Sequence, residues 1–204
     1  IVSTASLMLG VSAAHASTSA VLTAGIAGLV AGAMSMAAGE YVSVSSQKDA
    51  ERADMDIERR AIAENPKGEL AELAHIYVHR GLDPKLAREV AKQLHAHDAL
   101  SAHMRDELSI DTNALANPVQ ASVASATSFS AGAAVPILAA VISPSSFDVW
   151  AIVALSLLAL AVSGSVGASL GGGHHLRAAS RVFLGGGIAM AITALIGHLI
   201  GKAI

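Results

Sequence analysis

The sequence predicts an all-α integral membrane protein whose apolar spans are interrupted once by a charged helical domain. Hydrophobic residues make up 53% of the 204 residues and charged residues only 14%, whereas a soluble domain carries roughly 25% charged residues. The charge is concentrated, because residues 46–117 hold 14 of the 16 Asp and Glu and ten of the 13 Lys and Arg. We therefore expect helices in lipid on both sides of a domain in water.

The apolar segments set the number of spans. A helix that crosses about 30 Å of hydrocarbon needs roughly 20 apolar residues. Residues 1–15 are too few and lack the basic start of a signal peptide, so we interpret them as a truncated first span. Turn-forming sequences at Ser143-Pro144-Ser145-Ser146 and Gly171–His175 separate the last three spans. The sequence thus predicts five transmembrane helices, the first truncated and the others at 19–45, 118–142, 148–170 and 180–203.

Glycines four residues apart within the spans indicate where helices approach closely in lipid. Three such pairs are candidates for contact faces, with ordinary chance spacing as the alternative in a chain of 18 glycines: Gly28 and Gly32, Gly167 and Gly171, and Gly197 and Gly201.

Basic residues predict which face each loop occupies. With five spans, the 46–117 domain and the 171–180 loop lie on one face and hold twelve of the thirteen Lys and Arg, counting Arg181 at the loop's edge. Lys202 alone lies on the other side. Because basic loops stay in the cytoplasm, the domain is predicted to be cytoplasmic. The chain has no cysteine for disulfides or thiolate metal sites, and its net charge of −3 gives no indication of nucleic-acid binding.

The charged domain is predicted to be helices separated by stop signals. Residues 46–64 continue the second span without a breaker until Asn65-Pro66, which implies one long helix projecting from the membrane. A second helix covers 68–80 and ends at Gly81. Asp83 is a candidate N-cap for a third helix that runs to about residue 97. Residues 98–108 form a fourth helix or continue the third.

Acidic side chains gather on single faces of these helices. Residues three and four apart share one side of a helix. Helical bundles assemble sites for iron, manganese or zinc from such oxygen-rich and imidazole faces. The faces are formed by Glu51, Asp54 and Glu58 on the first helix, Glu69 and Glu72 on the second, and His103 and Glu107 on the last.

Two other interpretations of these residues stay open. In the first, the carboxylates simply form the solvent-exposed faces of amphipathic helices and bind no metal. Glu72-x-x-His75 resembles the inward-facing pair of di-iron carboxylate proteins, and His75 and His79 have helical ligand spacing. A di-iron oxidase would need a second Glu-x-x-His motif, and the sequence has none.

Glu40 is the one carboxylate within the spans apart from Asp148, the first residue of its span. Ionisable residues in membrane helices are costly and mark functional sites, although Glu40 is also placed where the second span reaches the cytoplasmic interface. Met36 lies one turn before it on the same face and offers a soft thioether ligand, with simple packing as the alternative for Met34 and Met36. Met36 and Glu40 are our candidates for a translocation path.

One run of residues carries a family resemblance. Residues 23–43, TAGIAGLVAGAMSMAAGEYVS, resemble the second span of the vacuolar iron transporter family in its nodulin-like branch. Residues 1–4, IVST, resemble the first span of that family, entered two residues late.

The resemblance implies a fold and a function. It implies a homodimer of five-span subunits with a pore between them and cytoplasmic helical domains that gather metal through glutamates. Members of the family export Fe²⁺, and often Mn²⁺, from the cytosol, and the eukaryotic ones exchange it for protons. It further implies that the chain is not an enzyme. Its membrane would be the plasma membrane in a prokaryote and a vacuolar-type membrane in a eukaryote.

The resemblance also assigns residues. The family's domain glutamates correspond to Glu58, Glu69, Glu72 and Glu107, His103 replaces a metal-binding Met of plant members, and Met36 matches the span methionine that lines the metal path. Ala61 and Gly28 stand where glutamates are common, and the first-span Asp would precede Ile1. We predict a transporter of divalent iron, manganese or both, with Zn²⁺ as an ion that can stand in for them. A membrane metal sensor and a di-iron oxidase are the alternatives.

Overall fold

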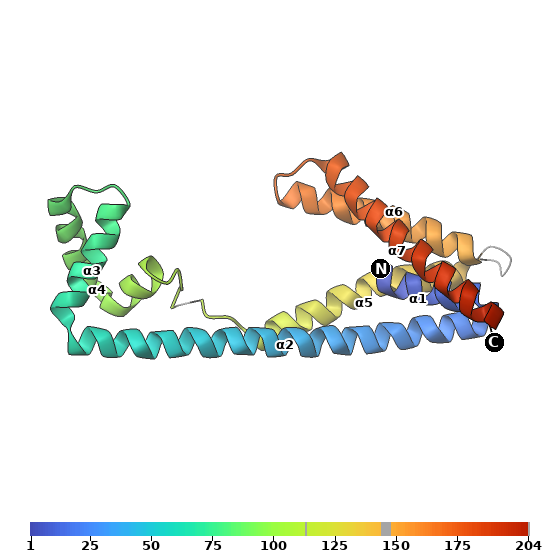
Figure 1. The fold of residues 1–204 in the computed structure, drawn as a ribbon, viewed down its shortest axis with the longest axis horizontal. Helices are drawn as coiled ribbons and strands as arrows, with labels where there is room; N and C mark the ends of the chain where they lie inside the picture. The colour runs from blue at the N-terminus through green and yellow to red at the C-terminus, as the bar shows by residue number, and fades with distance from the viewer. Residues whose placement is uncertain (113, 144–147, 204) are drawn as a thin grey trace. The chain divides into compact units, whose positions relative to one another are not determined.

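The computed structural model describes residues 1–112, 114–143 and 148–203, and the regular structure of these residues is entirely α-helical. The predicted turn at Pro144-Ser145-Ser146 lies outside them. Two compact units are formed, one by residues 1–39 with 122–204 and one by residues 40–121. The helices are α1 (Val2–Ala13), α2 (Thr18–Glu64), α3 (Pro66–His79), α4 (Pro84–Asp106), α5 (Pro118–Ile142), α6 (Asp148–Leu170) and α7 (His175–Ala203) (Figure 1).

Four of the described helices are long and apolar enough to cross a membrane, namely α2, α5, α6 and α7. This agrees with the predicted integral membrane class, whereas α1 has only 12 residues. α2 is one continuous helix of 47 residues, as predicted from the lack of a breaker before Asn65. α7 begins at His175, five residues before the predicted start at residue 180. The prediction marked the start of the apolar span, whereas the helix itself begins directly after the Gly171–Gly173 turn and includes the charged residue before that span.

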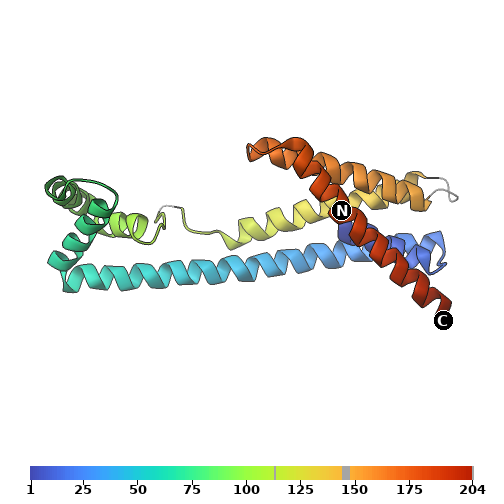
Figure 2. The same ribbon diagram turned by 45° about the horizontal axis from the view of Figure 1, so that its top comes forward.

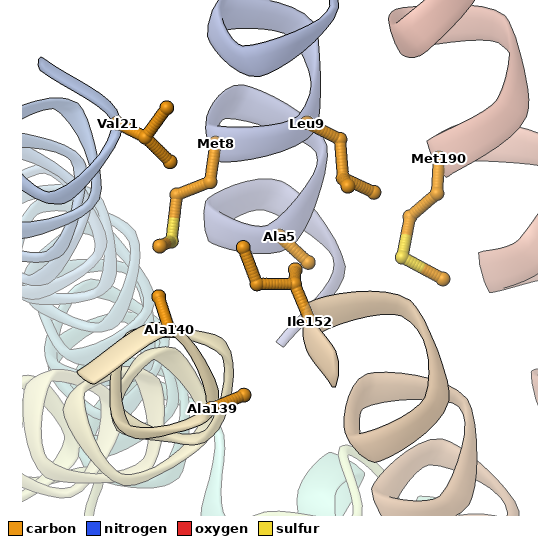
Figure 3. Close-up of a cluster of buried hydrophobic side chains, with 8 residues drawn as sticks. All are labelled: Ala5, Met8, Leu9, Val21, Ala139, Ala140, Ile152 and Met190. Atoms are coloured by element: carbon orange, nitrogen blue, oxygen red, sulfur yellow. The ribbon is translucent and has the colours of Figure 1, made fainter. Parts of the chain in front are cut away.

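The short helix α1 is the centre of the apolar unit. Its buried side chains Ala5, Met8 and Leu9 contact residues from all four long helices. Figure 3 shows this cluster, in which α1 is surrounded by Val21 of α2, Ala139 and Ala140 of α5, Ile152 of α6 and Met190 of α7. α1 therefore lies at the centre of this buried cluster.

Small residues allow the closest helix contacts. A Cβ atom on Gly201 would lie 2.6 Å from Ala14 Cα, and one on Gly197 would clash with the backbone of Gly10, so α7 approaches α1 along this pair. Gly28 and Gly32 likewise leave room for Leu7 and Phe129. The third predicted pair is wrong, because a Cβ on Gly167 would have no neighbour within 4 Å, and Gly164 is the residue at which α6 meets α7.

The second unit is built from α3 and α4 packed against each other. Leu73, Ala74 and Tyr77 of α3 are buried against Ala87, Ala91 and Ala102 of α4. Helix ends fall at the predicted signals: the Asn65 side chain accepts a hydrogen bond from Gly68 N–H at 3.1 Å, and Asp83 accepts one from Lys85 N–H at 2.9 Å. Gly81, with φ of 98°, follows the end of α3.

α4 is bent at Asp98, which has φ −159° and ψ 94° between two helical halves. The Asp98 carboxylate accepts a hydrogen bond from Ser101 N–H at 3.0 Å and so caps the second half. The sequence predicted either a fourth helix over residues 98–108 or a continuation of the third helix. Each alternative is partly right, because a new helical segment begins after Asp98 and the preceding segment of α4 runs directly into that residue. The change of direction within α4 is visible in Figure 2.

Candidate metal centre

Three helices supply the side chains of the candidate centre. Glu58 lies near the end of α2, Glu69 is in the first turn of α3, and His103 comes after the bend in α4. Asn65 separates α2 from α3 within a single residue. The cap at Asp98 redirects the last part of α4. Two local breaks in the chain thus determine where the three side chains lie.

The carboxylates converge on one nitrogen. His103 Nδ1 lies 3.0 Å from Glu58 Oε1, 3.5 Å from Glu107 Oε2 and 3.9 Å from Glu69 Oε2. The ligand atoms of Glu58, Glu69 and His103 are all within 4.8 Å of one another, which is a spacing that one metal ion can bridge. Of the five predicted domain ligands, the structure brings these four together.

The centre is buried, and its charges are not balanced. His103 is fully buried and Glu58 is 7% exposed. Among the described residues, Glu58 Oε1 and His103 Nε2 have no hydrogen-bond partner in suitable geometry. Buried charge of this kind is stable only when it is paired or bound to a metal. Three carboxylates around one imidazole therefore leave a surplus of negative charge.

The pKa of Glu58 reports this imbalance. Burial raises the pKa above its ordinary value, His103 opposes the rise, and the charges of Glu107, Glu69 and Glu72 add to it. Glu72, the fifth predicted ligand, therefore acts on the centre through its charge, although its side chain is exposed on α3. A divalent cation would pair with this negative charge and favour the ionised form of Glu58.

Glu107 is held in place by its neighbour Asp106. The Asp106 carboxylate accepts hydrogen bonds from Tyr77 Oη at 2.5 Å and Arg80 Nη1 at 2.6 Å, which ties the end of α4 to α3. Burial alone would raise the Asp106 pKa, but the hydrogen bonds from Tyr77, Arg105 and Arg80 overcome it and lower the pKa to about 2. This carboxylate stays ionised at any physiological pH.

His95 is a residue of the centre that the sequence did not reveal. Its ring lies edge-to-face with His103, with 5.8 Å between centroids, and its Nδ1 is buried with no hydrogen-bond partner among the described residues. Residues eight apart do not meet on a straight helix. The Asp98-x-x-Ser101 cap was the signal for the bend that brings them together.

Other candidates lie elsewhere. Met36 is 48% exposed and Glu40 is half-buried, both on α2. Glu51 accepts hydrogen bonds from Gln47 Nε2 and Ala116 N–H, so it has structural partners. Glu72 and His75 are both exposed, which does not match the inward-facing pair that a di-iron site requires.

The fold and this cluster define a multi-span helical membrane protein with a separate helical unit that carries an acidic, histidine-containing centre. Comparison with known proteins gives the family. The model of the VIT family matches residues 1–198. The chain therefore belongs to the VIT family, as the motif at residues 23–43 indicated.

Individual relatives agree. The chain is 48% identical to a vacuolar iron transporter of Acanthamoeba castellanii over 188 residues, which is 92% of this chain and 72% of the relative. It is 36% identical to vacuolar iron transporter homolog 2 of Arabidopsis thaliana, covering 98% of this chain and 79% of that protein. VIT-like transporter 1b of Glycine max is 39% identical, covering 100% and 72%. Each of these relatives is named as a transporter, in agreement with the prediction that the chain is not an enzyme.

Proposed function

We propose that this protein moves Fe²⁺ out of the cytosol across a vacuolar-type membrane and collects the ion in the centre formed by Glu58, Glu69, Glu72, His103 and Glu107. The observation that carries the proposal is the convergence of Glu58, Glu69 and His103 within 4.8 Å in a buried position. The relatives named vacuolar iron transporters support iron as the ion. Because carboxylate oxygens also suit Mn²⁺, we include manganese as a second substrate.

Capture follows from the charges. Glu58 holds a proton more tightly than an ordinary carboxyl, because burial and three neighbouring carboxylates raise its pKa. An incoming divalent ion replaces that proton and pairs with the surplus negative charge. The affinity of the centre therefore rises with pH. The glutamates hold hard ions, and the single imidazole of His103 adds a borderline ligand.

Passage through the membrane needs a path lined by polar or soft ligands, for which we propose Met36 and Glu40. Met36 is half-exposed on a single chain, with Val30 and Met34 exposed on the same helix. In the proposed homodimer, a second subunit packs on this exposed surface and encloses Met36 beside a pore between the subunits. Five spans, with the 46–117 domain and the 171–180 loop on the cytoplasmic face, complete the proposed arrangement, and we include proton exchange in it.

Transport assays test the proposal. The protein in proteoliposomes should take up Fe²⁺ and Mn²⁺ when a pH gradient is imposed, and Zn²⁺ tests the selectivity. Replacing Glu69 and Glu72 together with Ala should reduce the initial rate at low metal concentration at least tenfold, since the captured ion loses the Glu69 carboxylate and the nearby negative charge of Glu72. Glu64→Ala is the matched control, because Glu64 is an exposed carboxylate at the end of α2 outside the centre.

The same variants separate capture from transport. In the parent, Mn²⁺ at about 100 times its dissociation constant should stabilise the protein by about 2.7 kcal/mol, and the double Ala variant should lose that gain. Metal binding without uptake of any of the three ions would favour the sensor. Equal stabilisation of the parent and the double variant by Mn²⁺ would mean that Glu69 and Glu72 are ordinary solvent-exposed carboxylates that do not bind the ion.

A further inference from the structure

Two histidines on α3 lie outside the centre described above. His75 and His79 are one helical turn apart and both are exposed, while Leu73 and Tyr77 on the other side of α3 are buried against α4. Their Nε2 atoms are 2.9 Å apart. The rings meet edge-to-face with 4.3 Å between centroids and 86° between planes. Two imidazole nitrogens thus lie close together on the exposed side of α3.

That separation has a meaning for metal coordination. With metal–nitrogen bonds of about 2.0–2.1 Å, two nitrogens 2.9 Å apart subtend an angle of about 90° at a shared ion. A tetrahedral ion would hold the two nitrogens about 3.3 Å apart at the same bond length. The pair therefore matches adjacent positions of a square-planar or octahedral ion rather than a tetrahedral one.

Ligand type narrows the choice of ion. Imidazole nitrogens suit Cu²⁺ and Ni²⁺, whose affinities lie at the upper end of the divalent series and whose preferred geometry is square-planar or tetragonal. Water is available for the remaining positions, because both histidines are exposed. The buried centre differs in kind, since it joins three carboxylates to one imidazole.

We propose that His75 and His79 form a second metal site that binds Cu²⁺ and Ni²⁺ at the surface of α3, separately from the buried centre. The competing explanation for the 2.9 Å distance is a hydrogen bond from one imidazole N–H to the other Nε2, with no affinity for metal. At an exposed position such a bond contributes little to stability, so a metal ion displaces it at small cost. The proposal does not depend on which ion the protein transports.

Copper titration of the full chain in detergent micelles distinguishes the two explanations. Electron paramagnetic resonance of the first Cu²⁺ equivalent should show two equatorial imidazole nitrogens in the parent. His75→Gln and His79→Gln should each remove that two-nitrogen signal and raise the first Cu²⁺ dissociation constant at least tenfold. Equilibrium dialysis with Ni²⁺ should likewise show tighter binding by the parent than by either variant. Glutamine is a good helix former, so far-UV circular dichroism should stay unchanged.

Two control variants make the outcome decisive. His97→Gln removes another exposed histidine of the same unit, and His103→Gln removes the imidazole of the buried centre. Both control variants should keep the two-nitrogen signal. His174 and His175 are present in every variant, so any Cu²⁺ that they bind is the same throughout the comparison. The proposal is overturned if parent, His75→Gln and His79→Gln bind Cu²⁺ with equal affinity and spectra, or if His97→Gln or His103→Gln is the variant that loses the site.

Discussion

Glu58 shows how one buried side chain links the stability of the metal-free protein to the proposed metal capture. Its carboxylate faces His103 at 3.0 Å, yet Glu69 and Glu107 share the same nitrogen, so one imidazole has three anionic neighbours. Burial and these neighbours raise the Glu58 pKa. A raised carboxyl pKa means that ionisation of Glu58 opposes folding. The stability that the protonated carboxyl contributes is fully present below the pKa of the unfolded state and is lost as pH rises through the pKa of the folded state.

Replacing this carboxyl should therefore stabilise the protein without metal. We expect Glu58→Gln to raise the free energy of unfolding at neutral pH by on the order of 1 kcal/mol, because a buried charge without adequate pairing is removed. The difference from the parent should shrink as pH falls toward the ordinary glutamate pKa of 4.5. Thermal melts with a chelator present measure this. A variant less stable than the parent at neutral pH would contradict it.

At the scale of elements, the bend in α4 connects helix capping to the centre. Asp98 interrupts the helix and caps its second half, and His103 lies five residues later. The first half of α4 has its own cap at Asp83, which accepts a hydrogen bond from Lys85 N–H. The helix therefore carries two caps of the same chemistry, of which only the one at Asp98 lies next to the candidate centre.

Removing each cap separately tests this division. Asp98→Ala and Asp83→Ala should each cost about 1 kcal/mol of stability, the usual value for a lost N-cap. Only Asp98→Ala should weaken Mn²⁺ binding, by about tenfold, because it frees the segment that holds His103 and Glu107. Calorimetric titration with Mn²⁺ gives the affinity and melts give the stability. If both variants lost affinity equally, the bend would not position the ligands.

Met36 and Glu40 lie one turn apart on α2, and their proposed role in the path has its own test. Glu40→Gln keeps the size of the side chain and removes its charge, while Met36→Leu keeps the volume and removes the thioether. Each should lower the transport rate in proteoliposomes at least tenfold with metal binding to the centre unchanged. Met34→Leu, which alters a thioether that is 68% exposed on the same helix, is the control. Parent rates in both variants would place the path elsewhere.

At the scale of the whole molecule, the sequence predicted the features that depend on local chemistry. Composition, long apolar blocks and turn residues indicated the helical membrane class, and Asn65 and Asp83 marked helix ends that the structure confirms. The sequence left open whether a new helix starts at residue 98, and the structure shows a bend there with a cap from Asp98. Face spacing and family resemblance predicted one site of Glu58, Glu69, Glu72, His103 and Glu107, and the structure brings all of these but Glu72 together. The central position of α1 and the contact of His95 with His103 depend on tertiary packing, which no periodicity encodes.

Topology is the remaining property of the whole molecule that a direct measurement should settle. Because twelve of thirteen Lys and Arg fall in the 46–117 domain and the 171–181 segment, we expect these regions on the cytoplasmic face and the segment around Ser145 on the opposite face. The chain has no native cysteine, so Arg60→Cys, Ser180→Cys and Ser145→Cys each introduce a single thiol. In sealed vesicles of one orientation, an impermeant maleimide should label Ser145→Cys from one side and the other two from the opposite side. Opening the vesicles with detergent should make all three positions reactive, which is the control for access. Labelling of Arg60→Cys and Ser145→Cys from the same side would mean that the number of spans between them is even, and the five-span arrangement would have to be abandoned.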